Sequence, residues 1–463
     1  MSVVQTTSNL REHLKALPSL EFGTTAPASG TPILAVNDAV RYQQINGFGA
    51  AMTDSSAWLI EKSLPPAAGA GLLSTLFSPS SLHLDFVRVP IAASDFTATG
   101  APYSYDDPPP GKTDPNLVHF SIAHDEAYIL PALRQVGALN PQTEFLATPW
   151  TPPAWMKSND SLGNVGDRGT LLKSAYGPWA AYIVKFLQAY AAAGVPISAL
   201  TPQNEPQVAT SYPGLNLPEP TEADLITQDL IPALTRAHLA VKIYGGELGW
   251  SSASMPYFEG LVGSPAVHGL AGLSWHCYYG SPDAMSTLHY RDPALDEIVD
   301  ECSPGISAIP VSDVVISSLR NWASTVALWN LALNTEGGPV QQPNTGCSGC
   351  YGLAIVNQQT HSIRLTNAFF QLGQASEFIQ PGAVRVASTN FVTYDYTKPG
   401  VDFISPGLDD VAVLNPDGSR VVLVHDTAKY AITFAVEWDK LYFEYSVPAG
   451  ATVTFEWDRP AAS

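Results

Sequence analysis

Eight apolar, strand-like segments recur along this chain, and their alternation with helical segments limits the folds it can adopt. Each ends in polar, Gly or Pro residues and is followed by a helical stretch. Strands that alternate with helices build parallel sheets, and eight such units predict an α/β fold of the (β/α)8 TIM-barrel type. The segments are residues 45–51, 85–91, 144–149, 198–203, 242–247, 272–278, 297–302 and 324–331.

Helical signals between these segments support the prediction. Apolar residues over 180–187 follow the i, i+3, i+4, i+7 spacing of a helix, and Gly194 ends it. Thr221 is expected to cap a helix over 222–239, and a last helix is expected over 366–379. An open doubly wound sheet is the alternative, but Gly47-Phe48-Gly49 lacks the rest of a phosphate-binding glycine pattern.

The predicted secondary structure changes from alternating strands and helices to strands alone after the last helix. Short β-rich segments follow, joined by turn residues such as Asn415-Pro416-Asp417-Gly418. They predict a side β-sandwich domain, which we expect to include two strands, 33–36 and 40–45, that precede the barrel and are separated by a turn at Asn37-Asp38. The expected division is 1–44 for a leader and N-terminal strands, 45–381 for the barrel, and 382–463 for the β-sandwich.

The charge balance narrows the possible ligands. Against 42 acidic residues there are only 22 basic ones, a formal charge of −20. Such a surface repels phosphate backbones and anionic lipid, so we expect a neutral carbohydrate substrate, no nucleic acid and no stable membrane insertion. We expect a secreted or extracellular protein whose signal peptide is not part of this sequence, with a cytoplasmic location as the alternative. The sequence leaves the oligomeric state open.

Catalytic groups of such barrels lie where the strands end. Carboxylates, amides and aromatic rings gather at these ends, without a Cys–His cluster, and this mixture is typical of a sugar site; we expect no cofactor and no metal. The residues are Asp54 at the first strand, Arg88 and Asp95 at the second, Trp150 at the third, Asn204 and Glu205 at the fourth, Glu247 at the fifth, His276 and Tyr278 at the sixth, Glu301 at the seventh, and Trp329 and Asn330 at the eighth.

Glu205 and Glu301 form the most informative pair. The ends of strands four and seven face each other across a barrel mouth, so the two carboxyl groups can flank a glycosidic bond as acid/base and nucleophile. Asn204 could bind the sugar 2-hydroxyl. Glu247 remains a rival nucleophile, whereas strand alternation is expected to turn Asp300 to the opposite face as a structural partner.

Three further groups support or surround this pair. Arg88 is expected to pair with a catalytic carboxylate and keep it ionised. His276 either orients the surroundings of the nucleophile or is a satisfied core histidine. Cys347 and Cys350 are expected to form a local disulfide or to remain two thiols, because two cysteines without neighbouring histidines do not complete a tetrahedral metal site.

An ordered set of motifs resembles glycoside hydrolase family 30, a clan A family of retaining β-glycosidases that includes glucosylceramidases and endo-β-1,6-glucanases. The resemblance runs from about residue 40 to the end of the chain. Its motifs lie at residues 47–54, 88–91, 94–96, 148–157, 203–206, 301–303, 329–333, 337–339 and 415–418.

The resemblance implies a retaining β-glycosidase in which Glu205 is the acid/base and Glu301 the nucleophile. It implies that Tyr278 lies near the nucleophile and that four other residues line the sugar pocket: Asp54, Trp150, Asn204 and Trp329. Cys277 departs from the pattern, since the glucosylceramidases carry tryptophan there.

Several functions remain open. We expect a glucosylceramidase-like β-glucosidase with a place in carbohydrate and sphingolipid metabolism. An endo-β-1,6-glucanase, a β-xylosidase or a β-fucosidase of the same family is the alternative, and the loop Cys347-Ser348-Gly349-Cys350 resembles the β-1,6-glucanases more. Outside this class, the chain could be a carbohydrate-binding protein on a degenerate barrel, or a metal- or cofactor-dependent enzyme.

Overall fold

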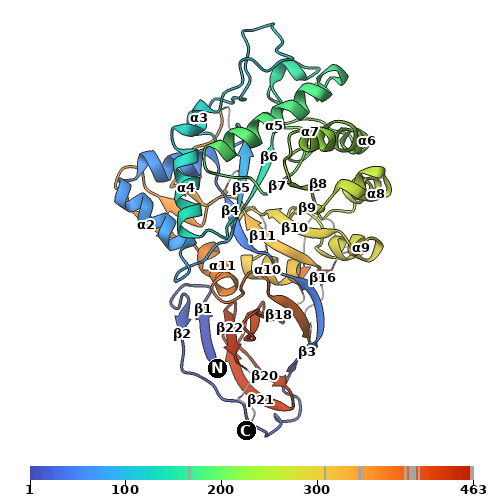
Figure 1. Ribbon diagram of the computed structural model, residues 1–463. Coiled ribbons are helices and arrows are strands. Elements are labelled where there is room, and N and C mark those ends of the chain that lie inside the picture. The colour runs from blue at the N-terminus through green and yellow to red at the C-terminus, as the bar shows by residue number, and fades with distance from the viewer. Residues whose placement is uncertain are drawn as a thin grey trace.

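The computed structural model describes residues 1–164, 168–306, 309–342, 347, 349–389, 394–395, 403–404 and 407–458. This part of the chain forms a closed parallel barrel that stands on a large β-sheet built from both ends of the chain (Figure 1). The barrel and the side β-sandwich predicted from the sequence are therefore confirmed.

The barrel closes in the order β10-β11-β4-β5-β6-β7-β8-β9, which excludes an open doubly wound sheet. Each of the eight predicted strand segments overlaps one of these strands, although β7 spans only two residues. The strands are β4 (Gly47–Ala51), β5 (Phe86–Ile91), β6 (Glu144–Pro149), β7 (Ala199–Leu200), β8 (Lys242–Gly249), β9 (Gly272–His276), β10 (Asp296–Glu301) and β11 (Ala323–Leu328).

Helices cover the outside of the barrel, and their apolar faces pack on the strands in one large core. They are α1 (Asp54–Trp58), α2 (Pro66–Phe77), α3 (Ala123–Glu126), α4 (Ile129–Leu139), α5 (Tyr176–Ala192), α6 (Glu219–Asp224), α7 (Ile231–Arg236), α8 (Met255–Gly263), α9 (Asp283–Arg291), α10 (Val311–Arg320) and α11 (Asn367–Ser376). Short 3-10 or π turns are η1 (Leu59–Ser63), η2 (Ala154–Met156), η3 (Lys173–Ala175), η4 (Leu225–Leu230) and η5 (Pro265–Gly269).

Two of the helix predictions are confirmed and one boundary is wrong. Helix α5 spans the periodic residues and ends before Gly194, and α11 begins after Thr366. The helix expected to start after Thr221 begins earlier, at Glu219, because Pro218 provides the first turn's acceptor for the Thr221 N–H. None of the helices described is both long and apolar enough to cross a membrane.

The described part of the β-domain is one sheet of nine strands in the order β2-β1-β22-β19-β18-β15-β3-β20-β21. It folds over itself, since Phe443 of β21 and Phe455 of β22 contact each other at 5.0 Å between ring centroids. The strands are β1 (Ser2–Thr6), β2 (Lys15–Ala16), β3 (Ile33–Gln44), β15 (Val384–Ser388), β18 (Leu408–Leu414), β19 (Arg420–Asp426), β20 (Ile432–Trp438), β21 (Leu441–Val447) and β22 (Thr452–Trp457).

Small sheets complete the fold. They are β12 (Ala332–Asn334), β13 (Ala354–Val356) and β14 (Ile363–Leu365), and, separately, β16 (Tyr394–Asp395) and β17 (Phe403–Ile404).

The N-terminal strands differ from the sequence prediction in two ways. The expected turn at Asn37-Asp38 is wrong, because β3 continues through it and accommodates the extra residues as a register shift against β15. The polar leader also contains a strand, β1, which pairs along its whole length with β22. A strand that adds to an existing sheet is stabilised by main-chain bonds, so its own sequence need not alternate clearly.

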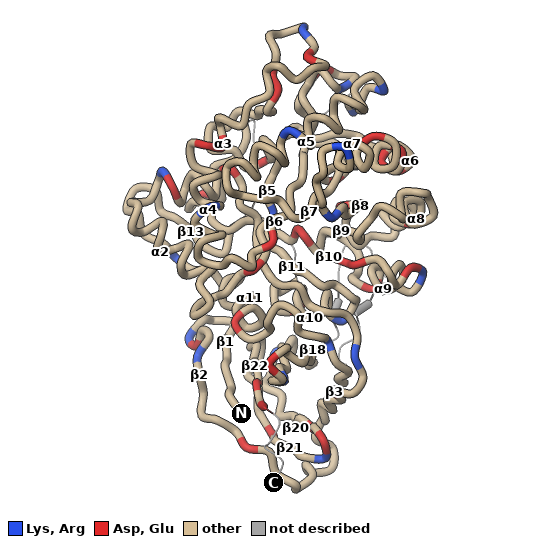
Figure 2. Tube along the Cα trace, viewed as in Figure 1, with Lys and Arg blue, Asp and Glu red and all other residues tan. Residues whose placement is uncertain are grey.

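Helices α10 and α11 join the barrel to the sheet through polar contacts. The Ser312 and Thr452 hydroxyls lie 2.6 Å apart, and Thr454 donates to the Gln374 carbonyl at 2.6 Å. Acidic residues occur in both parts of the molecule (Figure 2). The excess of negative charge is therefore distributed and does not form a single anionic face.

Candidate active site

Arg88 of β5 is the centre of the polar network inside the barrel mouth. Its side chain is fully buried, and Nη1 donates to Glu301 Oε2 at 2.5 Å. Nη2 donates to Asn204 Oδ1 at 2.8 Å and to Glu247 Oε2 at 3.1 Å, while Nε lies 2.8 Å from Asp300 Oδ2. Burial alone would disfavour the guanidinium charge, but the surrounding carboxylates raise the pKa of Arg88. The predicted pairing of Arg88 with a site carboxylate is present.

Two strand irregularities direct carboxylates toward Arg88. The pairing of β9 shifts register at Glu247 of β8 and at Asp300 of β10. A bulge changes the face to which a side chain points. The expectation that Asp300 faces away from Glu301 is therefore wrong: both carboxylates contact the same guanidinium.

Glu247, the rival nucleophile, is enclosed by other protein groups. Thr148 and Thr201 donate to its Oε1 at 2.8 and 2.6 Å. Burial raises the pKa of Glu247 well above its usual range, although Arg88 opposes this shift. A buried carboxyl group that does not line the cavity is poorly placed to attack a substrate.

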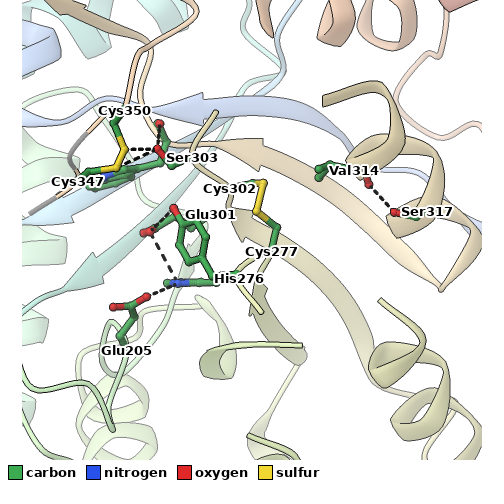
Figure 3. The surroundings of a disulfide bond; sticks show 12 residues. Glu205, His276, Cys277, Glu301, Cys302, Ser303, Val314, Ser317, Cys347 and Cys350 are labelled. Carbon is green, nitrogen blue, oxygen red and sulfur yellow. Dashed lines mark hydrogen bonds and ion pairs between the residues drawn. A yellow bond between two sulfur atoms is a disulfide. The ribbon is translucent and has the colours of Figure 1, made fainter. Parts of the chain in front are cut away.

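Glu205 and Glu301 approach each other closely on either side of His276 (Figure 3). One oxygen of each carboxylate and a His276 ring nitrogen all lie within 4.8 Å of one another. His276 Nδ1 is 3.1 Å from Glu205 Oε1 and 3.8 Å from Glu301 Oε1. The Tyr278 hydroxyl donates to Glu301 Oε1 at 3.1 Å.

The electrostatics of this group favour a charged His276. Burial disfavours protonation of the ring, but Glu301, Glu205 and Asp300 outweigh it and raise the pKa of His276 to about 9. Burial raises the pKa of Glu301, while His276 and Arg88 favour its ionised form. His276 therefore acts as a cation between carboxylates at neutral pH, rather than as an uncharged core histidine.

The loop after β7 is held so that Asn204 and Glu205 meet this network. The Gln203 amide donates to the Trp150 carbonyl at 2.6 Å, and Asn204 N donates to the Pro149 carbonyl at 2.9 Å. Both contacts tie the loop to the end of β6. The short strand and its prolines thus deliver the amide and the carboxylate to the barrel mouth.

A cavity of about 200 Å³ opens above the carboxylate pair. Two of its walls are the Trp150 and Trp329 rings, which stack at 5.0 Å between centroids, with Arg88 lying 4.6 and 5.2 Å from these rings. Indole faces and hydrogen-bonding groups together suit a sugar ring. The lining residues are Asp95, Trp150, Asn204, Glu205, Tyr212, Tyr278, Tyr279, Glu301, Ile306, Trp329 and Cys347.

Asp54 lies elsewhere. Its carboxylate accepts hydrogen bonds from the Ala98 N–H and from the Tyr103 and Tyr128 hydroxyls, and it is 2.5 Å from His124 Nε2. These groups belong to the segment after β5, to α3 and to the start of α4. Asp54 thus fixes that segment and is outside the set of residues that line the cavity.

Five cavity residues were not among the predicted substrate contacts: Asp95, Tyr212, Tyr279, Ile306 and Cys347. Tyr212, Tyr279 and Ile306 lie on loops, where no periodic pattern marks them. Asp95 stood at the end of strand two, which was the available signal. Its burial, with Glu301 and Glu205 nearby, raises the pKa of Asp95 well above its usual range, which favours the neutral acid form.

Two disulfides lie beside the cavity (Figure 3). Cys347–Cys350 was one of the two expected states of that pair, whereas Cys277–Cys302 was not foreseen. The sequence places these last two cysteines 25 positions apart, and only the barrel brings them together.

Three groups could offer ligands to a metal ion in the part of the chain described. Within each group, one possible ligand atom from every residue lies within 4.8 Å of those of the other two. The first group is Asp106, Asp114 and His119, the second is Glu205, His276 and Glu301, and the third is Glu247, His276 and Asp300. His276 belongs to two of them, and its protonated ring offers no lone pair at neutral pH.

Comparison with known proteins places the chain among the barrel glycoside hydrolases. The family model described as glycosyl hydrolase family 30 TIM-barrel domain matches residues 45–287, and the family 30 beta sandwich domain matches residues 382–455. The chain belongs to glycosyl hydrolase family 30 and is a glycosidase. The resemblance seen in the sequence motifs is confirmed.

Relatives of this chain include proteins named as endo-1,6-beta-glucanases and proteins named as glucosylceramidases. The chain is 33% identical to an endo-1,6-beta-D-glucanase of Neurospora crassa, covering 95% of this chain and 91% of the relative. It is 30% identical to the lysosomal acid glucosylceramidase of Mus musculus, covering 92% and 84%. Among solved structures, the endo-beta1,6-glucanase BT3312 is 27% identical with a TM-score of 0.85, and each chain is covered to 99%.

Proposed function

We propose that this protein is a retaining β-glucosidase that hydrolyses β-1,6-glucan, with Glu301 as nucleophile and Glu205 as acid/base. The observation that supports this proposal most strongly is the distance between the two carboxylates. One oxygen of Glu205 and one oxygen of Glu301 lie within 4.8 Å of each other at the cavity. Retaining glycosidases hold their carboxyl groups about 5–5.5 Å apart, whereas inverting enzymes leave about 6.5–9.5 Å for a water molecule.

In the first step Glu301 attacks the anomeric carbon. Arg88 and Tyr278 each bind one oxygen of its carboxylate, which fixes the direction of attack. Glu205, as general acid, gives a proton to the leaving oxygen. The glycosidic bond breaks as the glycosyl ester forms on Glu301.

In the second step Glu205 takes a proton from water, and the resulting nucleophile hydrolyses the ester. Glu301 carries no negative charge while it is esterified, and Glu205, having given up its proton, serves as the base. His276 supports this state by donating from Nδ1 to Glu205 Oε1. The same residue thus acts as acid and then as base.

The sugar at the cleavage site would rest against Trp150 and Trp329, with Asn204 and Tyr278 reaching its hydroxyl near the nucleophile. We add Asp95 to these contacts. Among the residues that the structure describes, none bonds its buried Oδ1. A sugar hydroxyl would complete this hydrogen bonding.

We base the proposed β-1,6 linkage of the substrate on the names of the relatives that this chain resembles. The sequence motifs favoured a glucosylceramidase-like enzyme, but the endo-1,6-beta-D-glucanase of Neurospora crassa is 33% identical to this chain and the mouse glucosylceramidase 30%. Glucosylceramide is the second candidate substrate, because that relative still covers 92% of the chain. We also propose an oxidising, extracellular location, since two disulfides are rare in cytosolic proteins.

One experiment separates these candidates. Purified protein is incubated with a linear β-1,6-glucan, with glucosylceramide in detergent and with aryl β-glucosides, and the products are identified by chromatography. We expect β-1,6-linked oligosaccharides early in the glucan reaction. Release of glucose from glucosylceramide alone would overturn the linkage, and binding without cleavage of any glycoside would support a carbohydrate-binding protein.

The assignment of Glu205 has its own test. Glu205→Ala should lose activity on substrates with poor leaving groups, but it should retain the first step on activated aryl glucosides. Added azide should restore turnover and give a β-glycosyl azide, because an external anion then replaces the activated water. Equal loss on all substrates without rescue would contradict the role.

A further inference from the structure

The Cys277–Cys302 disulfide joins the two strand ends that carry the proposed catalytic machinery. Cys277 directly follows His276, the last residue of β9, and Cys302 directly follows Glu301, the last residue of β10. Their Cα atoms are 5.1 Å apart, within the range of native disulfides, and each residue is only 1% exposed. Figure 3 shows the bond beside Glu301 and His276.

The two residues on either side of Cys277 contact the proposed catalytic carboxylates. His276 contacts Glu205, and Tyr278 on the other side of Cys277 donates to Glu301. The main chain adds two links: Cys277 N donates to the Glu301 carbonyl at 3.1 Å, and Trp329 N donates to the Cys302 carbonyl at 2.9 Å. Any displacement of Cys277 relative to Cys302 therefore changes the distances among these side chains.

The strand pairing itself is weak at this point. The register of β9 and β10 shifts at Asp300, so Glu301 and His276 form a single pair beyond the bulge, at the end of both strands. Strand ends and bulges lose ladder hydrogen bonds. In addition, Glu205 and Glu301 carry like charges at close range and repel each other when both are ionised.

We propose that the Cys277–Cys302 disulfide is a positioning device for this site: it holds His276 and Tyr278 against Glu301 and so maintains the geometry of the carboxylate pair. The proposal rests on the proposed roles of Glu205 and Glu301. The two cysteines touch neither substrate nor reacting atoms, and they act through the residues beside them.

The bond itself is tested first in the native protein. Digestion without a reductant, after thiols have been blocked under denaturing conditions, should give a cross-linked peptide that contains Cys277 and Cys302. Mass spectrometry identifies it. Blocked thiols at both positions, in protein isolated without a reductant, would overturn the proposal.

The positioning role is tested with Cys277→Ala/Cys302→Ala. We expect kcat on an aryl β-glucoside to fall at least tenfold, with KM changed less than threefold, well below the unfolding temperature. Val424→Ala, in the core of the β-domain, is the matched control for lost stability and should keep native kcat. Unchanged kcat in the double variant would overturn the proposal.

A second measurement does not depend on turnover. In protein labelled at the histidine rings, the His276 NMR signal should titrate near 9 in the native protein and at least one pH unit lower in the double variant, because its carboxylate partners are no longer held. An unchanged titration would contradict the proposal. If the double variant does not fold, Cys277→Val/Cys302→Val refills the lost volume and is measured in the same way.

Native protein that titrates as expected but cleaves no glycoside would refute the proposed function and leave this geometric role standing.

Discussion

His276 and His425 are both buried among carboxylates, one at the barrel mouth and the other between the barrel and the β-sheet. His276 lies between Glu205, Asp300 and Glu301. His425 Nδ1 lies 2.5 Å from Asp313 Oδ1 of α10. In both cases burial opposes protonation, and the neighbouring carboxylates outweigh it and raise the pKa of the histidine.

The two clusters differ in what lies beside them. Glu205 and Glu301 line a cavity, and the Glu205 side chain is 18% exposed. In the second cluster, the side chains of His425 on β19 and Asp313 on α10 are 3% and 1% exposed. A shifted pKa marks a buried charge cluster in either place, whereas access for a substrate distinguishes the catalytic one.

The largest expected effect is that of Glu301→Gln. This change removes the nucleophile but keeps the shape of the side chain, so kcat on aryl β-glucosides should fall by about 10⁴-fold or more. Initial rates on an aryl β-glucoside measure it. Asp313→Asn is the matched change in the second cluster and should keep kcat within about twofold. Activity near the native level in Glu301→Gln would refute the nucleophile and the comparison together.

Replacing each histidine by glutamine should separate activity from stability. His276→Gln loses the charged donor to Glu205, and we expect kcat to fall by about 10²-fold. His425→Gln removes the imidazole that contacts Asp313, which should cost about 3 kcal/mol of unfolding free energy with kcat unchanged. Urea denaturation and steady-state rates measure the two quantities. A loss of kcat in His425→Gln would show that the second cluster also serves catalysis.

The pH dependence of stability should follow the raised pKa of His276. A group whose pKa is higher in the folded state stabilises the fold fully below its unfolded pKa and loses that contribution as pH rises through its folded pKa. For His276 the window lies between about 6.5 and about 9, and the contribution is about 3 kcal/mol. The difference in unfolding free energy between native protein and His276→Gln should shrink across this window. A constant difference would show that His276 is not charged in the folded state.

Asp95→Asn should have the smallest effect. The raised pKa of Asp95 favours its neutral acid form, and an amide reproduces the donor and acceptor of a carboxylic acid, so KM should change less than about threefold. Asp95→Ala removes the hydrogen bond and should raise KM about tenfold. Both values come from aryl β-glucoside kinetics at pH 6 to 7. A large loss in Asp95→Asn would indicate that the ionised form is needed.

The sequence predicted the barrel well because each of its eight buried strands appears in the sequence as a short run of apolar residues. Each contains enough apolar residues to be recognised, as β6 at residues 144–149 shows. It predicted the β-domain strands less completely, since β1 is polar and is stabilised by pairing with β22 at the other end of the chain. Strand ends pointed to most of the cavity residues, but Tyr212 and Tyr279 come from loops without a periodic pattern.

The sequence by itself determined the fold class, the family and the two glutamates that stand at opposite strand ends. These follow from local hydrophobic patterns and ordered motifs, which need no knowledge of contacts. Only the tertiary structure decided that Asp300 joins Glu301 on Arg88, that Asp54 accepts a hydrogen bond from the Ala98 N–H, and that Cys277 meets Cys302. A one-residue bulge reverses the face of a side chain, and a contact across 25 residues depends on barrel closure, so neither leaves a periodic signal in the sequence.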